Sequence, residues 1–298
     1  MSAPFNPDRA RALINLLSPE RLTRVVDIGA NPLDETPYKG LLSVGGCDVW
    51  GFEPQEAAFE KLMAAKGPHE HYICAAVGDG DKAELKICSD SGFTSLLEPN
   101  AAFIEGTGQF RDRMEIVERI TVRTTRLDDL DDLPDFDLLK IDIQGGERMV
   151  FRSGPEKLAK ALAVITEVAA LPIYEGQPLM GDQMVELGQH GFMLHKFLFI
   201  KDIGYRNPWS GRLKRSAYRS QLGDGDAVMV RGLLDMQGLD VEELKHLAIL
   251  ADTVFLTQDL AVTAMVELMQ RGALTDAQLH DYIDMLPNAA PRPVEAAQ

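Results

Sequence analysis

Three short segments constrain the fold of this chain most: VVDIGAN at 25–31, GFEP at 51–54 and LLKIDIQGGE at 138–147. The first is typical of the end of a buried strand, where Asp27 interrupts an apolar run and Gly29 lets the backbone turn tightly. The second is again strand-like and presents Glu53 at roughly the 20-residue interval at which a βαβ unit offers an acid to a ribose. Together they predict an α/β fold with a nucleotide-type pocket.

The glycines of the first turn indicate which nucleotide the pocket would take. A dinucleotide site needs G-x-G-x-x-G so that the backbone can approach a pyrophosphate, whereas Gly29 is followed here by Asn31 and Pro32. S-adenosylmethionine has no phosphate, and its pocket needs a tight turn and acids for its ammonium and ribose hydroxyl groups. The loop favours S-adenosylmethionine over NAD. The alternatives are an NAD-dependent oxidoreductase and a non-catalytic nucleotide-fold scaffold, and a plain α/β core would need no ligand.

The order of the segments carries a family resemblance. With the AAVGDGDKAELKI reversal, the GFTSLL stretch and the late GDAVMVR strand, residues of about 25–231 resemble the FkbM-type S-adenosylmethionine-dependent methyltransferases. The resemblance implies a class I, Rossmann-like, doubly wound and mostly parallel seven-stranded sheet. It also implies O-methylation of a hydroxyl on a carbohydrate-containing or other small natural-product acceptor, with S-adenosylhomocysteine as product. One departure is NPLDETPYKGLL, where many members have a further glycine after the Asn.

Periodicity predicts how the chain is organised. Strand-like runs alternate with helical ones, which favours a parallel sheet with ligands at the strand C-termini; these runs are 22–28, 47–52, 71–77, 137–143 and 161–168. GDGDK at 78–82 predicts a hairpin or strand reversal, and MLHKFLFIK and DAVMVR predict paired closing strands.

We expect a methyltransferase domain over 1–232, with an N-terminal helix in 1–21, and a helical extension with a frayed tail over 233–298. The spacings of Asp240 with Glu243 and of Thr275 with Gln278 predict capping boxes in the extension. Its Leu, Val and Met residues make it a candidate homodimer interface, although packing within the chain would use the same residues.

The candidate catalytic groups are Asp142, Glu167, Glu147 and His195. Lys140 and Asp142 share one side of the fourth strand, where polar residues are costly unless they pair or serve a site. Asp142 and Glu167 are expected to face the acceptor, because a base must remove the proton of the attacking hydroxyl. The alternatives are a structural Lys140–Asp142 pair, a buried hydrogen-bonded Glu167, a helix-first-turn role for Glu147 and a structural role for His195.

The cofactor candidates follow the pocket and the resemblance. Asp27, Gly29 and Asn31 are expected at the methionine end, with Asp142 beside them, and Glu53 and Pro54 at the ribose. The resemblance implies that the 76–79 turn, with Val77 and Asp79, borders the adenine.

A basic, aromatic stretch at 196–219 suggests the acceptor. Its cations are opposed by Asp202 alone, and they are Lys196, Lys201, Arg206, Arg212, Lys214, Arg215 and Arg219. Tyr205 and Trp209 could stack on a sugar while cations such as Arg212 hold an anionic group. We therefore expect a small-molecule or glycan acceptor, and we add Lys140 and Tyr174 to the substrate candidates. A solvated loop explains the same residues.

Charge and composition exclude several other classes. The formal charge of −16 opposes general binding to DNA or RNA. The apolar run near 158–173 is too short for a bilayer, and the start of the chain does not read as a signal peptide, so we expect a cytoplasmic protein without membrane contact. Cys47, Cys74 and Cys88 lack C-x-x-C spacing and the histidines lack H-E-x-x-H, so we expect buried free thiols and no metal.

Overall fold

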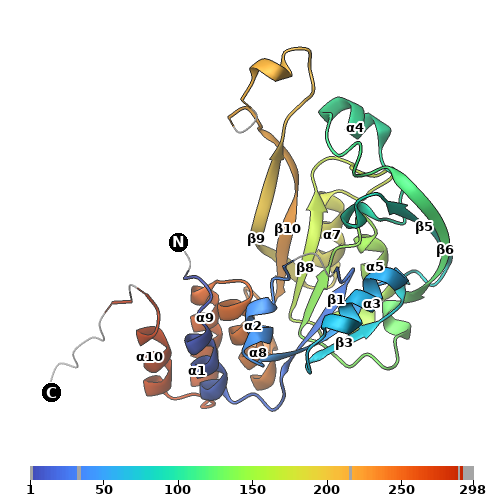
Figure 1. Cartoon of the computed structure of the whole chain (residues 1–298). Helices are drawn as coiled ribbons and strands as arrows, with labels where there is room; N and C mark the ends of the chain where they lie inside the picture. Colours follow the sequence, from blue (N-terminus) through green and yellow to red (C-terminus); the bar gives the residue numbers. More distant parts are fainter. Residues whose placement is uncertain (1–2, 32–34, 215–216, 288, 291–298) are drawn as a thin grey trace, which may run out of the picture. The chain divides into compact units, whose positions relative to one another are not determined.

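The computed structural model describes residues 3–31, 35–214, 217–287 and 289–290. The chain divides into two compact units. We call them the sheet unit, comprising 25–33 and 49–231, and the helical unit, comprising 1–24, 34–48 and 232–298. Each unit is described by itself below (Figure 1).

The main sheet has seven strands in the order β3-β2-β1-β7-β8-β10-β9. Their bounds are β1 Thr23–Ile28, β2 Cys47–Phe52, β3 Glu70–Ile73, β7 Leu138–Ile141, β8 Ala163–Ala169, β9 Phe192–Ile203 and β10 Gln221–Arg231. β1, β7 and β8 pair in parallel, as do β2 and β3, whereas β10 is antiparallel to both of its neighbours. The expected seven-stranded, mostly parallel sheet and the expected pairing of the closing strands are both confirmed.

A second sheet of three strands has the order β4-β6-β5. It comprises β4 Ala76–Gly78, β5 Lys82–Cys88 and β6 Ile116–Arg126. β6 lies between β4 and β5, so the chain reverses at 78–82 without forming a hairpin. We did not expect β6, because the exposed charged residues Glu118, Arg119 and Arg123 interrupt its apolar residues.

The sheet unit also contains helices, and two of them contribute to its core. The helices are α3 Glu56–Ala65, α4 Ala101–Thr107, α5 Glu147–Ser153, α6 Pro155–Leu158 and α7 Met180–Gln189, with 3-10 turns at Ser91–Phe93, Leu127–Asp129 and Ser210–Arg212. α5 and α7 contribute Val150, Phe151 and Leu187 to a buried core that also contains Leu139 and Ile141. Because side chains alternate along a strand, Lys140 points to the opposite face from this core.

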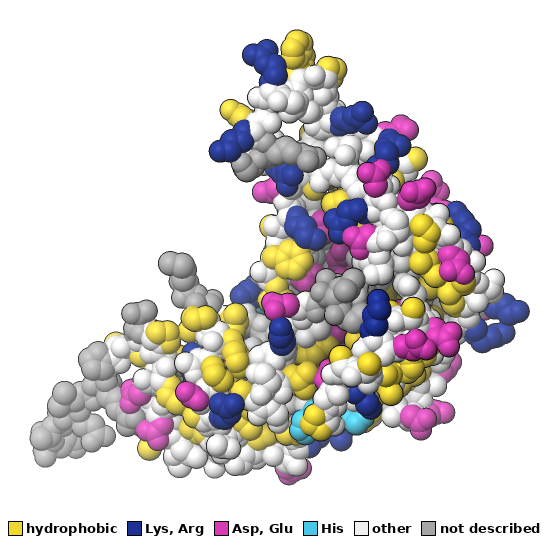
Figure 2. Space-filling model, in the orientation of Figure 1, with side chains coloured by type: hydrophobic (Ala, Val, Ile, Leu, Met, Phe, Trp, Pro, Cys, Tyr) yellow, Lys and Arg dark blue, Asp and Glu magenta, His cyan; other side chains and the backbone are white. Residues whose placement is uncertain are grey.

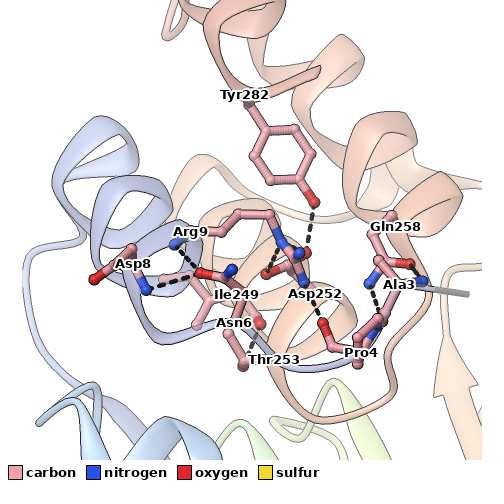
Figure 3. A network of polar contacts seen from close by, with 10 residues as sticks. All are labelled: Ala3, Pro4, Asn6, Asp8, Arg9, Ile249, Asp252, Thr253, Gln258 and Tyr282. Atoms are coloured by element: carbon pink, nitrogen blue, oxygen red, sulfur yellow. Dashed lines mark hydrogen bonds and ion pairs between the residues drawn. The ribbon is translucent and has the colours of Figure 1, made fainter. Parts of the chain in front are cut away.

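The helical unit contains α1 Pro7–Leu17, α2 Lys39–Ser43, α8 Val241–Thr253, α9 Gln258–Gln270 and α10 Asp276–Asp284, with a 3-10 turn at Met236–Gly238. A buried network joins three of these helices (Figure 3). Arg9 Nε donates to Asp252 Oδ1 at 2.9 Å, and the Tyr282 hydroxyl donates to the same oxygen at 2.8 Å. The N-terminal helix, which we expected within the 1–232 domain, therefore packs with the C-terminal helices. The domain boundary at residue 232 stays a prediction.

Local signals in the helical unit are confirmed. Asp240 with Glu243 and Thr275 with Gln278 form capping boxes at the starts of α8 and α10. No large hydrophobic side chain is exposed on the described residues of α8, α9 and α10. The Leu, Val and Met side chains of these helices therefore pack within the chain. A dimer through these helices stays a prediction.

Two whole-chain expectations can also be compared with the structure. Across the described ranges, no helix is long and apolar enough to cross a membrane. Cys47 and Cys88 are buried free thiols as expected, but Cys74, which follows the end of β3, is exposed.

Candidate active site

Acidic side chains gather on one face of the main sheet, at the carboxyl ends of its strands. The register aligns Asp27 of β1 with Lys140 of β7, and Glu167 of β8 with Asp226 of β10. Lys140 aligns with Ile165, two residues before Glu167, so these side chains point to the same face. The topology thus collects residues from four strands at the edge where α/β sheets bind ligands.

Gly29 joins the turn after β1 to the end of β7. Its φ of +85° is in the left-handed region, and an added Cβ would lie 2.0 Å from the carbonyl oxygen of Asp142. The Asp142 amide in turn donates to the carbonyl of Ile28 at 3.0 Å. Only a glycine permits this approach, which places the predicted cofactor turn directly against the predicted acceptor acid.

Lys140 is a half-buried cation among the carboxylates of Asp27, Asp142, Glu167 and Asp226, which we call the acidic row. Its Nζ lies 3.2 Å from Asp27 Oδ1, with side-chain exposures of 13% and 1%. Burial opposes the charge of Lys140, but the carboxylates of Asp27, Asp142 and Asp226 outweigh it and hold its pKa above the ordinary value. Lys140 therefore neutralises the row from within, and its ion-pair partner is Asp27 rather than Asp142.

Gln144 connects the two candidate catalytic acids. Its Nε2 donates to Asp142 Oδ1 at 2.8 Å and to Glu167 Oε2 at 3.0 Å. Its Oε1 lies 2.8 Å from the hydroxyl of Tyr174, and its backbone carbonyl accepts from Ser95 Oγ at 2.7 Å. Gln144 has a φ of +57°, an uncommon conformation for a non-glycine residue that tends to occur at functional sites.

The Asp142–Glu167 pair is electrostatically strained. Burial, and then the negative charge of Asp142, raise the pKa of Glu167 well above its ordinary value. Two carboxylates this close repel each other, and this repulsion favours the protonated form of Glu167. Such a pair is able to accept a proton from a bound hydroxyl group.

Glu147 turns its carboxylate back onto its own loop. Its Oε1 accepts from the amides of Ile143 and Gly145, both at 3.0 Å, and the side chain is buried. Burial raises its pKa to about 7 against these hydrogen bonds. These contacts favour the helix-first-turn role of Glu147, which shapes the loop that carries Gln144.

The oxygens of Asp142, Glu147 and Glu167 come within 4.8 Å of one another. Gln144 occupies one oxygen of Asp142 and one of Glu167, and carboxylate oxygens at this spacing are able to hold a metal ion. The absence of a metal stays a prediction.

Glu53 is buried at the end of β2. Burial raises its pKa to about 7, while the amide of Gln55, which donates to Oε1 at 2.7 Å, opposes that shift. The negative charge of Asp27 also raises the pKa of Glu53, so Asp27 is close enough to Glu53 to affect its titration. Oε2 of Glu53 makes no hydrogen bond with any described residue, which leaves it available to a ligand hydroxyl.

Comparison with known families agrees with this geometry. Residues 27–206 match the model of the methyltransferase FkbM domain, which is more than half of the 298-residue chain. The chain belongs to the FkbM methyltransferase family. The matched region runs from Asp27 of the acidic row to Arg206, just beyond β9.

Solved structures resemble this FkbM domain only distantly. A precorrin-6y C5,15-methyltransferase from Geobacter metallireducens is 11% identical with a TM-score of 0.36, over 74% of this chain and 87% of that one. The C-terminal domain of the Rhodobacter capsulatus precorrin-6Y C5,15-methyltransferase is 12% identical with a TM-score of 0.33, over 75% and 88%. Similarity at this level does not identify an acceptor, and no curated protein matches the sequence.

Other predicted cofactor residues of the FkbM domain lie at the same end of the sheet or close to it. Asn31 and Pro54 follow β1 and β2 and are half-buried. Val77 is buried in β4, whereas Asp79 is an exposed turn acid whose Oδ1 accepts from the amide of Asp81 at 3.0 Å. These contacts show Asp79 shaping the 78–82 turn; its contact with adenine stays a prediction.

The structure does not bring His195 to the acid pair. His195 lies in β9, four residues before Phe199, which pairs with Asp226. At roughly 3.3 Å per residue, this is about 13 Å along the strand. Tyr174, in contrast, is fully buried and reaches the site through Gln144.

The basic stretch forms the end of β9 and the segment 204–220 between β9 and β10. Tyr205 and Trp209 are exposed, and the Arg212 guanidinium lies 5.9 Å from the centre of the Trp209 ring. Figure 2 shows Lys and Arg side chains mixed with hydrophobic ones over this extension, which is at the top of Figure 1. Arg215 lies outside the described residues.

Gln144 is the site residue whose role sequence reasoning missed. The signal was available in the QGG triplet, because two glycines after a polar residue predict a left-handed turn at the strand end.

Proposed function

We propose that this FkbM methyltransferase transfers the methyl group of S-adenosylmethionine to a hydroxyl of a carbohydrate-containing acceptor. The observation that carries the proposal is the contact between Gly29 and the backbone of Asp142. It puts the turn expected at the methionine end of the cofactor beside the acid expected at the acceptor, as a direct displacement requires.

The residues at the strand ends fit the cofactor. Glu53 offers a buried carboxylate with one open oxygen, which suits ribose hydroxyl groups that donate hydrogen bonds. Asp27 is already paired with Lys140, so its charge is shared between that ammonium and the pocket. When bound, S-adenosylmethionine would supply an electrophilic methyl group on a sulfonium.

The acid pair would then take the proton of the acceptor hydroxyl. Gln144 holds Asp142 and Glu167 from one side and leaves the second oxygen of each carboxylate without a hydrogen bond to any described residue. An acceptor hydroxyl that donates a hydrogen bond to one of these oxygens would be oriented by it and would lose its proton to it. This arrangement suits a hydroxyl acceptor, because its oxygen carries a proton that the acid pair can remove.

Calorimetric titration of S-adenosylhomocysteine tests the cofactor part of the proposal. We expect micromolar binding by the wild type, a loss of at least tenfold in Glu53→Gln, and no effect in Glu118→Gln, whose side chain is exposed on β6. NAD serves as the competing ligand. Binding of NAD in place of S-adenosylhomocysteine, or no binding of either, contradicts the proposal.

Turnover tests the acceptor part. A panel of sugars and glycans is incubated with labelled S-adenosylmethionine, and the label is located by mass spectrometry. We expect label on a hydroxyl oxygen, and label on nitrogen or carbon would contradict O-methylation.

A further inference from the structure

A cavity of about 340 Å³ lies where the 204–220 segment meets the end of α4. This volume falls within the range of small-molecule sites. The backbone amide of Arg206 donates to the carbonyl of Gly106 at 2.8 Å, and the stem of the Arg206 side chain packs over Gly108. The cavity is therefore formed by two parts of the sheet unit that are held together by a hydrogen bond.

The side chains that line this cavity suit a sugar bearing a negative charge. Tyr205, Arg206, Tyr218 and Arg219 contribute to its walls, and none of the described residues that line it is acidic. Neither guanidinium forms an ion pair with a described side chain, although the chain carries a net charge of −16. Both tyrosines are more than 60% exposed, and flat aromatic rings with a polar edge bind the apolar faces of sugars. Unpaired guanidinium groups bind phosphate or carboxylate oxygens.

The position of the cavity sets the length of a ligand that uses both sites. The Tyr205 hydroxyl donates to Gln221 Oε1 at 2.5 Å, and Gln221 begins β10 five residues before Asp226, the partner of Glu167. At roughly 3.3 Å per residue, the cavity is about 16 Å from the acid pair along the strand. Lys201, whose Nζ is 2.7 Å from Asp224 Oδ2, lies along this path.

We infer that this cavity is a distal subsite for the anionic end of an extended, sugar-containing acceptor. The inference rests on the proposed function, because it assumes that the methylated hydroxyl lies at Asp142 and Glu167. A single sugar ring does not span the distance, so the acceptor has at least two linked units. The anionic group is a phosphate or a carboxylate, which guanidinium groups bind in the same way.

Binding of small probes tests the subsite directly. Glucose 1-phosphate, glucuronate and glucose are titrated into the full-length protein in the presence of S-adenosylhomocysteine. We expect at least one of the two anions to bind at least tenfold more tightly than glucose, and the tighter one identifies the charged group. Equal affinity for all three, or no binding of either anion, overturns the inference.

Charge variants distinguish binding at the cavity from general electrostatic attraction to the basic segment. In Arg206→Gln/Arg219→Gln we expect at least a tenfold loss of anion affinity. In Lys214→Gln, which removes a cation of the same segment that does not line the cavity, we expect less than a twofold loss. A comparable loss in both, or retained affinity in the double variant, contradicts the subsite.

A separate signal covers the case in which the double variant folds poorly. Ring resonances of Tyr205 and Tyr218 in the wild type should shift on titration with the tighter anion, and unchanged resonances overturn the assignment. S-adenosylhomocysteine binding without anion binding ends this inference and leaves the proposed function standing. Loss of S-adenosylhomocysteine binding in the wild type ends the proposed function itself.

Discussion

Replacing Lys140 with methionine tests whether this lysine neutralises the acidic row. The substitution keeps the apolar stem and removes the charge 3.2 Å from Asp27 Oδ1. Asp27, at 1% side-chain exposure, is then a buried carboxylate without that cation, and removal of one partner of such a pair costs about 3–5 kcal/mol. Asp142 and Asp226 lose the same compensating charge, so we expect the free energy of unfolding to fall by an amount in the upper part of that range.

The reverse substitution should cost less. Asp27→Asn leaves the Lys140 ammonium facing Asp142 and Asp226, so the remaining charge is still compensated and we expect a loss of about 1–3 kcal/mol. The double variant should lose less than the sum of the two single losses, by about 1–3 kcal/mol, because the residues interact directly.

Urea unfolding followed by tryptophan fluorescence measures these changes. Trp50 lies in β2 and reports on the sheet unit, whereas Trp209 is exposed and contributes little change. Lys82→Met, at an exposed position of β5, is the matched control and should stay within about 0.5 kcal/mol of the wild type. A loss below about 1 kcal/mol in Lys140→Met, or equal losses in the two single variants, would refute the reasoning.

Three further predictions follow from the same site. Gly29→Ala places a Cβ 2.0 Å from the Asp142 carbonyl oxygen, so we expect loss of S-adenosylhomocysteine binding by calorimetry and a lower melting temperature; unchanged binding would contradict the close contact. Asp142→Asn should abolish turnover with cofactor affinity within threefold, as measured by paired turnover and binding assays, and unchanged turnover removes Asp142 from the mechanism. Several acids of the site have raised pKa values, which for Glu53 and Glu147 are about 7 and for Asp226 about 6. Between pH 5 and 7 the folded state therefore binds more protons than the unfolded state, and the urea midpoint should fall as pH rises; a rising midpoint contradicts these directions.

Most of the main sheet was predictable because β1, β2, β7 and β8 are short, largely apolar runs, whereas β3 reads EHYI and has no buried residue. The second sheet and the grouping of the helices were harder to predict. β6 alternates charged and apolar residues and pairs with two other strands, so its stability comes from partners that no local window contains. The grouping of α1 with α8 and α10 includes the ion pair of Arg9 with Asp252, 243 positions apart, and no sequence periodicity predicts such a pair.

The site could be predicted as a set of residues, but not as a set of contacts. Asp27, Glu53, Asp142 and Glu167 all mark strand ends, and that signal is local. The partner of Lys140 was not local: Asp142 is its neighbour in sequence, but the parallel register of β1 and β7 places Asp27 beside it. Spacing along one strand cannot reveal a partner on the next strand until the strand order is known.

Gln144 shows why the strand end reads QGG. The turn after β7 needs a left-handed residue, and glycine would adopt that conformation with less strain than glutamine at φ +57°. Glycine, however, has no side chain to place between two carboxylates. A neutral amide has two N–H groups and one oxygen, so it can donate to Asp142 and Glu167 at once and still accept from Tyr174. A cation there would lower the pKa of both acids and weaken them as bases, and a carboxylate would repel them. The strained glutamine is thus the residue that holds the acid pair together while leaving it able to take a proton.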